Sequence, residues 1–337
     1  MKMNMYEWVD SLNHCGPKKS LPVLTFPSVQ LMDVSVRELI SDSKLQAKGM
    51  MAIADRVDAL GCVSYMDLSV EAEAFGAKIQ VFDAEVPTVI DALVTNREEA
   101  EALKVPDVYR GRTKCYIEAI TEVGKQITDK PVFAGMIGPY SLAGRLVDVS
   151  QAMIYCMKDP ETIKIVLDKA TDFLIAYAKE YKKTGINGIV MAEPLSGLLS
   201  PKLEAKFSAP YVKKIVDAVQ DENFIIIYHN CGNATVKMVD SISNNGCKVF
   251  HFGNAINMKD MLEKFPSDKI VMGNISPAEQ FYSGTPESMR EAVLSLLEEC
   301  SGYPNFVISS GCDIPPMSKW ENIDAYFAAI EEFYAKH

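Results

Sequence analysis

The sequence predicts an α/β protein, and more closely a (β/α)8 TIM barrel made of one domain. Eight short apolar runs bounded by turn residues recur along the 337 residues, and helical periodicity fills most of the gaps between them. Some runs are continuous in Ile, as in Ile225-Ile226-Ile227, which is typical of parallel strands covered on both faces. No glycine-rich dinucleotide fingerprint follows any run, which disfavours an open doubly wound sheet.

The expected strands are spaced so that a helix fits between most neighbours. They cover residues 21–26, 62–66, 131–134, 188–191, 224–228, 248–252, 270–272 and 306–309. We therefore expect a single barrel domain over residues 1–337, with residues 1–20 as an N-terminal extension and no linker.

Three of the intervening helices have clear start signals. Asp159-Pro160-Glu161 combines an N-cap, a proline in the first turn and an acid placed against the helix dipole, and Gly185 closes that helix. Thr285-Pro286-Glu287 opens a second helix in the same way. Ser208, before Pro210, opens a third.

The composition excludes several classes of function. A hydrophobic content of 48% allows a large core, and no apolar stretch approaches the roughly twenty residues that cross a bilayer, so we expect no membrane insertion. Eight cysteines without a secretory pattern indicate a reducing compartment, and we expect a cytoplasmic protein. A net charge of −11 opposes binding to a polyanion, so nucleic acid is not an expected partner.

The most informative motif is His229-Asn230-Cys231 at the end of an apolar run, with Cys312 following another run about eighty residues later. One imidazole and two thiolates suit Zn²⁺, and three protein ligands leave a fourth position open, as in catalytic zinc sites. In a closed barrel the strand ends face a common mouth, which brings distant ligands together. The alternative is that these cysteines are small buried hydrophobes.

Four longer motifs extend this pattern, and with them the chain resembles the uroporphyrinogen decarboxylase superfamily, in particular its zinc-dependent methylcobalamin:coenzyme M methyltransferase branch. They are His229-Asn230-Cys231-Gly232-Asn233, Gly273-Asn274-Ile275-Ser276-Pro277, Ser310-Gly311-Cys312-Asp313-Ile314-Pro315-Pro316 and Asp67-Leu68-Ser69-Val70-Glu71-Ala72-Glu73-Ala74.

The resemblance implies a uroporphyrinogen decarboxylase-like barrel with His229, Cys231 and Cys312 as zinc ligands. It further implies a methylated corrinoid as methyl donor, not permanently bound and brought by a corrinoid carrier protein or free in solution. A small-molecule thiol, activated as a zinc thiolate, is the implied acceptor.

Two departures from the superfamily patterns bear on the substrate. Residues 25–32 lack the arginine with which the decarboxylases hold their tetrapyrrole, so haem-pathway decarboxylation is disfavoured. His251-Phe252-Gly253-Asn254 stands where the methyltransferases have an acidic pair. His251 or water is then expected at the fourth zinc position, and the acceptor need not be coenzyme M.

Further candidates follow the other strands. Glu193 is a candidate catalytic residue, either orienting the substrate or accepting the free N–H of the zinc-bound imidazole, and Asn274 is a second one. Glu71, Glu73 and Ser276 are candidate cofactor-binding residues. Acids at a helix start are also common as dipole partners, and Glu193 is equally compatible with a surface carboxylate.

The ligand set favours alkyl transfer to sulfur. Only a few per cent of a thiol is ionised at neutral pH, and zinc removes its proton. Because two cysteinates cancel the charge of Zn²⁺, an added thiolate keeps its electron density. A decarboxylase, lyase or hydrolase using metal-bound water remains an alternative, as does a non-catalytic corrinoid- or tetrapyrrole-binding protein.

Overall fold

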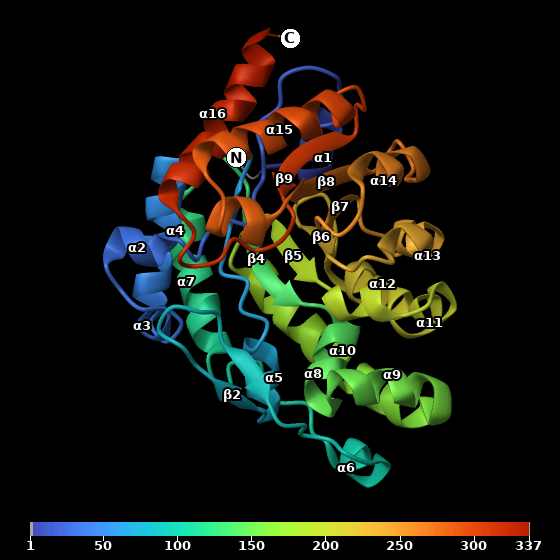
Figure 1. Cartoon of the computed structure of the whole chain (residues 1–337). Helices are drawn as coiled ribbons and strands as arrows, with labels where there is room; N and C mark the ends of the chain where they lie inside the picture. The colour runs from blue at the N-terminus through green and yellow to red at the C-terminus, as the bar shows by residue number, and fades with distance from the viewer. Residues whose placement is uncertain (1–2, 337) are drawn as a thin grey trace.

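The computed structural model describes residues 3–336, and its centre is a curled parallel sheet (Figure 1). The seven strands pair in the order β1-β4-β5-β6-β7-β8-β9, and every pairing is parallel. Their bounds are β1 Cys62–Val63, β4 Val132–Ile137, β5 Gly188–Ala192, β6 Ile225–Asn230, β7 Val249–Phe252, β8 Ile270–Ile275 and β9 Phe306–Ser310. The predicted TIM-barrel-like α/β architecture is confirmed, and each of these strands overlaps an expected one.

The prediction of a strand over residues 21–26 is wrong. This buried segment lies between β9 and β1, the two edges of the sheet, but it pairs with neither as a ladder. Leu21 donates its N–H to the Ile308 carbonyl at 3.3 Å, and Thr25 reaches a β1 carbonyl with its hydroxyl group instead of its backbone. Pro22 has no N–H to donate, so a regular ladder is interrupted at its start.

Helices cover the outer face of the sheet (Figure 1). The α-helices are α1 Met5–Ser11, α2 Ser28–Met32, α3 Val36–Leu39, α4 Ser43–Arg56, α5 Val70–Phe75, α6 Arg97–Ala102, α7 Thr113–Gln126, α8 Pro139–Val147, α9 Val149–Lys158, α10 Pro160–Lys183, α11 Pro201–Phe207, α12 Ala209–Val219, α13 Val239–Ser243, α14 Met258–Lys264, α15 Pro286–Cys300 and α16 Trp320–Lys336. Short 3-10 turns cover Pro194–Leu198 and Thr235–Met238, and a π-helical turn covers Pro277–Tyr282.

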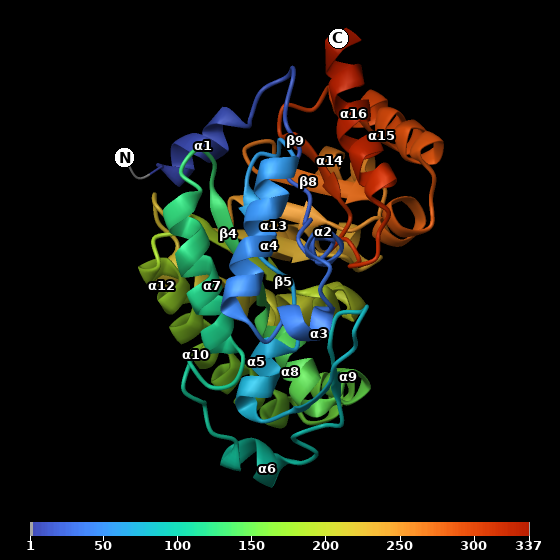
Figure 2. The same ribbon diagram turned by 90° about the vertical axis from the view of Figure 1, so that its left-hand side faces the viewer.

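The predicted helix starts are confirmed. Asp159 caps α10 by accepting the N–H of Thr162, and Gly185 follows the helix with a φ of +88°. Thr285 caps α15 in a capping box with Ser288, and α12 begins directly after Ser208. Figure 2 shows α4 and α7 side by side on one flank of the barrel.

A small antiparallel hairpin was not expected from the sequence. It pairs β2 Lys78–Gln80 with β3 Thr88–Ile90. Both strands are three residues long and largely solvent-accessible, so they lack the apolar run or alternation that marks a longer strand.

Strand alternation divides the core into two layers. In β6, Ile225 and Ile227 pack in the cluster inside the barrel, while Ile226 and Tyr228 pack in the cluster beneath the helices. Both faces of the strand are buried, which explains the continuous apolar run. The next inward-facing position on β6 is His229.

Helix α1 packs its apolar side against this inner cluster. Met5, Val9 and Leu12 belong to the same buried group as Ile225 and Val307. Within residues 3–336 no helix is long and apolar enough to cross a membrane. That the domain spans all of 1–337 stays a prediction, since residues 1–2 and 337 lie outside the described part.

Candidate metal centre

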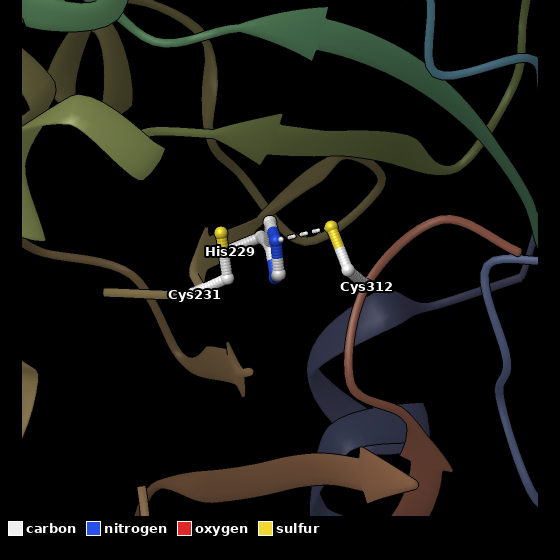
Figure 3. Close-up of side chains that lie close together, drawn as sticks. All are labelled: His229, Cys231 and Cys312. Carbon is white, nitrogen blue, oxygen red and sulfur yellow. Dashed lines mark hydrogen bonds between the residues drawn. The ribbon is translucent and has the colours of Figure 1, made fainter. Parts of the chain in front are cut away.

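Three side chains of the predicted zinc site come from the carboxyl ends of two strands. His229 is the penultimate residue of β6, and Cys231 follows two positions later, on the same side of the chain. Cys312 lies two residues beyond the end of β9. Figure 3 shows the His229 ring between the two sulfur atoms. Residues far apart in sequence are thus brought together, as a barrel mouth requires.

The distances between the ligand atoms suit a tetrahedral zinc site. Each of the three residues offers one atom, and these atoms all lie within 4.8 Å of one another. The Nε2 atom of His229 is 3.4 Å from the Sγ atom of Cys312 (Figure 3). Zn–S and Zn–N bonds of about 2.3 and 2.0 Å place tetrahedral ligand atoms about 3.5–3.8 Å apart, so shifts of about 1 Å complete the geometry. In the described residues no other group of three His, Cys, Asp or Glu side chains meets this criterion.

The two thiols interact strongly with each other. A hydrogen bond from Cys312, helped by the nearby His229, lowers the pKa of Cys231, while the same bond and burial raise the pKa of Cys312. The hydrogen bond between the two sulfur atoms therefore favours ionisation of Cys231 over that of Cys312. Both cysteines are only partly buried, whereas His229 is 3% exposed, so the sulfur side of the site is the accessible one.

The turn after β6 is shaped to present Cys231. Asn230 donates from Nδ2 to the Ser196 and Tyr228 hydroxyl groups at 2.8 and 3.0 Å, and its Oδ1 accepts the Gly232 N–H at 2.9 Å. A Cβ atom added at Gly253 would lie 2.5 Å from the Cβ of Cys231, so glycine at the end of β7 leaves the space that this cysteine occupies.

His251 contacts the Nδ1 atom of His229, whereas the Nε2 atom of His229 faces the Cys312 sulfur. The two Nδ1 atoms are 2.6 Å apart, and His251 Nε2 is 2.8 Å from the Oγ atom of Ser309. Burial and the neighbouring His229 hold the pKa of His251 well below its ordinary value, so its ring is neutral. The structure does not bring His251 into the group of ligand atoms, where the sequence had suggested a fourth ligand.

Glu193 directly follows β5 and serves the start of α8. It is fully buried, and its carboxylate accepts the Ser141 N–H at 2.6 Å, the Ser141 hydroxyl at 2.9 Å and the Tyr140 N–H at 3.2 Å. Burial raises its pKa to about 8, against the opposing effect of the Ser141 hydrogen bonds. The predicted contact with the zinc-ligand imidazole is not made, because His229 uses its Nδ1 on His251.

Glu71 and Glu73 lie on α5 in different surroundings. Glu71 is 1% exposed and accepts the N–H of Ile137 at 3.1 Å, while its other oxygen has no hydrogen-bond partner. Burial raises the pKa of Glu71 to about 8. Glu73 pairs with Arg112 Nε at 2.7 Å. Neither is placed among the three zinc-ligand atoms, and their predicted role in cofactor binding stays a prediction.

Asn274 and Ser276 flank the end of β8. Asn274 is the fifth residue of the strand, rather than a residue after it, and donates from Nδ2 to the Gly253 and Ile256 carbonyl groups at 3.0 Å each. Ser276 caps the π-helical turn by accepting the Glu279 N–H at 3.2 Å. Both therefore organise loops at the mouth, and their predicted catalytic and cofactor roles stay predictions.

Two contacts near the site were not expected from the sequence. Ser309 faces the barrel interior, two positions after Val307, and its hydroxyl donates to the Leu21 carbonyl at 2.6 Å. Arg112 binds Asp67 and Glu73 and so neutralises acids that follow β1. Strand alternation could have identified Ser309 as inward-facing; nothing local identified Arg112.

Known proteins with similar sequences or the same fold include methyltransferases and a decarboxylase. Methylcobamide:CoM methyltransferase MtbA of Methanosarcina acetivorans is 31% identical over 266 residues, which are 76% of this chain and 75% of the relative. A uroporphyrinogen decarboxylase of Pseudoalteromonas translucida is 24% identical over 71% of this chain and 70% of its own. A solved structure of a methyltransferase from Methanosarcina mazei has a TM-score of 0.84 at 23% identity, covering 99% of this chain and 100% of that one, which confirms the fold.

The comparison also extends over almost the whole described chain. The family model for uroporphyrinogen decarboxylase (URO-D) matches residues 27–333, a range that includes all three candidate zinc ligands and every strand of the barrel. The resemblance read from the sequence motifs is thereby confirmed: the chain belongs to the uroporphyrinogen decarboxylase (URO-D) family.

Proposed function

We propose that this protein is a zinc-dependent methyltransferase that moves a methyl group from a methylated corrinoid to a thiol. The observation that carries the proposal is the convergence of His229, Cys231 and Cys312 from β6 and β9 on one point. The name of the 31% identical relative, a methylcobamide:CoM methyltransferase, supports the reaction class and the corrinoid donor.

The residues of the site divide the work between charge and orientation. Zn²⁺, when bound, lowers the pKa of a thiol that ligates it, so that the thiolate is present at neutral pH. The sulfur atoms of Cys231 and Cys312 balance the dication, and the neutral ring of His229 adds no charge, so the acceptor sulfur keeps its nucleophilicity. The acceptor sulfur then forms a bond to the methyl carbon as the cobalt–carbon bond breaks, its electron pair staying on cobalt and the thiol proton passing to solvent.

A groove of about 490 Å³ opens beside the site and suits a small acceptor. Its walls include Asp313, the neighbour of Cys312, together with Glu85, Tyr282 and Met317, and the residues that line it include no Lys or Arg. The Oδ1 atom of Asp313 is buried without a hydrogen-bond partner. The lack of a cation in the lining disfavours a sulfonate, and the open Oδ1 atom favours a thiol that carries a second hydrogen-bonding group.

The test combines metal analysis with methylcobalamin demethylation, followed by the change in corrinoid absorbance. We expect one zinc per chain and transfer to at least one thiol from a set of cysteamine, 2-mercaptoethanol and coenzyme M, with cysteamine or 2-mercaptoethanol the better substrate. Cys231→Ala and Cys312→Ala should lose both zinc and transfer. Cys15→Ala, which changes an exposed cysteine, should keep both.

Two outcomes would contradict the proposal. Transfer at the wild-type rate by zinc-free protein would remove the role of the three ligands. Release of carbon dioxide from uroporphyrinogen, with no demethylation in the presence of any thiol, would instead assign the decarboxylase reaction. We further propose that a carrier protein presents the corrinoid, and the expected sign is a higher kcat/KM with carrier-bound than with free methylcobalamin.

A further inference from the structure

A chain of hydrogen bonds connects His229 to the backbone of the segment 21–26; we call it the hydrogen-bond chain. The Nδ1 atom of His229 contacts the Nδ1 atom of His251 at 2.6 Å, and His251 Nε2 contacts the Oγ atom of Ser309 at 2.8 Å. Ser309 Oγ contacts the Leu21 carbonyl oxygen at 2.6 Å. Each of these three side chains is 3% exposed or less, so water does not compete for the contacts.

The directions of the bonds in this hydrogen-bond chain follow from its last acceptor, the Leu21 carbonyl group, and from metal ligation by His229. A carbonyl oxygen only accepts, so the one hydroxyl proton of Ser309 points to Leu21. Ser309 must then accept from His251, which puts a ring proton on His251 Nε2. Of the two Nδ1 atoms in contact, one must donate and the other accept, and a His229 that ligates a metal through Nε2 keeps its ring proton on Nδ1. His229 therefore donates from Nδ1, and His251 Nδ1 accepts. The Nε2 atom of His229, 3.4 Å from the Cys312 sulfur, is left with a free lone pair.

We propose that His251 and Ser309 are positioning residues that fix the metal-binding tautomer of His229. This rests on the proposed zinc site, but it needs neither the corrinoid nor the thiol. A neutral imidazole has two tautomers, and only the one protonated on Nδ1 can ligate through Nε2. The hydrogen-bond chain selects that tautomer and orients the His229 ring toward the two cysteines.

The choice of an imidazole as acceptor also has an electrostatic reason. A zinc-bound histidine usually donates its other N–H to a carboxylate, a carbonyl group or water. With two cysteinates and a substrate thiolate, the site already carries a net charge of about −1, since each thiolate cancels one charge of Zn²⁺. A neutral acceptor adds no further negative charge to a buried region. Glu193, the carboxylate expected for this role, is bound instead to the start of α8.

Two pairs of isosteric variants test the role of the hydrogen-bond chain. Ser309→Thr and Ser309→Val add the same bulk, but only threonine keeps the hydroxyl group. His251→Gln and His251→Met have similar shapes, but only glutamine can accept from His229 while donating to Ser309. Zinc affinity is measured by competition with a chelator, and the Co²⁺-loaded forms by their thiolate-to-metal absorption bands. We expect zinc binding 10–100-fold weaker for Val and Met, and within about threefold of wild type for Thr and Gln.

The tautomer itself can be observed in the loaded protein. The chain has only four histidines, so two-bond ¹⁵N–¹H spectra of labelled, zinc-loaded protein can be assigned with the His251→Gln variant. We expect His251 to carry its proton on Nε2 and His229 on Nδ1. Circular dichroism of each variant checks that it is folded.

The outcomes separate this assignment from the proposed function. A proton on Nδ1 of His251, or equal zinc affinity within both variant pairs, would overturn the assignment. Normal zinc binding with the expected tautomers but no methyl transfer to any thiol would overturn the function alone. Absence of zinc binding by the wild-type protein would overturn both.

Discussion

Two groups of ionisable residues at the barrel mouth are used in opposite ways, and we name them the carboxylate side and the sulfur side by their chemistry. They are neighbours in space, since the Glu193 N–H donates to the His229 carbonyl at 2.8 Å. On the carboxylate side, which we define as Asp67, Glu71, Glu73 and Glu193, each side chain accepts hydrogen bonds from the protein itself. On the sulfur side, defined as His229, Cys231 and Cys312, the ligand atoms all lie within 4.8 Å of one another.

The difference shows which residues at a strand end are available to a ligand. Asp67 accepts the Ser69 N–H and hydroxyl, the Tyr116 hydroxyl at 2.9 Å and the Arg112 guanidinium, so its acceptor positions are filled. A thiol is a weak hydrogen-bonding group, and Cys231 and Cys312 contact each other, His229 and the backbone at Cys231 and Asp313. The carboxylate side therefore holds the mouth together, and the sulfur side is left free for a metal.

If this division is correct, the largest loss of stability should follow the removal of Arg112. Its side chain is 11% exposed and pairs with Asp67, whose side chain is fully buried. Arg112→Met leaves that carboxylate unpaired, and we expect a loss of about 3–5 kcal/mol in the free energy of unfolding, with zinc content unchanged. Urea denaturation and metal analysis measure the two effects.

Arg37→Met is the matched control for Arg112. Arg37 pairs with Asp83, but the two side chains are 56% and 73% exposed, so the loss should stay below about 1 kcal/mol. Loss of zinc from folded Arg112→Met protein would show that the carboxylate side takes part in metal binding and would break the comparison.

The next largest effect concerns the sulfur side, where stability should depend on metal. At a zinc concentration 100 times the dissociation constant, binding adds about 2.7 kcal/mol to the wild-type protein. Cys312→Ala should lose this increment while the metal-free stabilities of the variant and the wild type agree within about 1 kcal/mol, since the side chain is only partly buried. Thermal denaturation with and without zinc measures both. A zinc-dependent rise in Tm that persists in Cys312→Ala would place the metal elsewhere.

How far the sequence predicts this site depends on which contacts each residue makes. His229, Cys231 and Cys312 follow from strand ends that share one mouth, so topology alone brings them together. The hydrogen-bond chain through His251 and Ser309 runs from β7 across β8 to β9, so it depends on the register of these strands. His251 pairs with Met272, and Met272 with Val307. One sequence does not define register between three parallel strands.

The errors have the same origin in long-range contacts. Residues 21–26 are apolar because they are buried between two sheet edges, and burial alone resembles a strand when Pro22 is overlooked. The expected contact of Glu193 with the zinc-ligand imidazole is not made, although the position of Glu193 after β5 is correct, and its role in orienting the substrate stays a prediction. Its partners, Tyr140 and Ser141, lie more than fifty residues earlier in the chain, where no local signal points to them.

A third prediction uses the raised pKa of Glu71 on the carboxylate side. Burial raises this pKa from 4.5 in the unfolded chain to about 8 in the folded protein. The folded state therefore binds the proton more tightly, so the stabilisation is fully present below pH 4.5 and is lost as the pH rises through about 8. Between pH 6 and 8 the wild-type protein should lose about 2 kcal/mol relative to Glu71→Gln. A difference between Glu71→Gln and the wild-type protein that stays flat over this pH range would mean that the Glu71 carboxyl is ionised in the fold.

The smallest effect separates the two roles of Ser276. As the cap of the π-helical turn it accepts one N–H, that of Glu279, so Ser276→Ala should cost about 1 kcal/mol in unfolding free energy. In that case zinc affinity and the KM for methylcobalamin stay unchanged, because the hydroxyl group serves only the backbone. If Ser276 instead binds the cofactor, as its motif suggests, KM rises several-fold while stability changes little. Ser276→Asp keeps a capping oxygen but adds a charge, so it should retain stability in either case. A rise in KM for Ser276→Asp, together with an unchanged KM for Ser276→Ala, would show that the loop lies near the corrinoid without bonding to it.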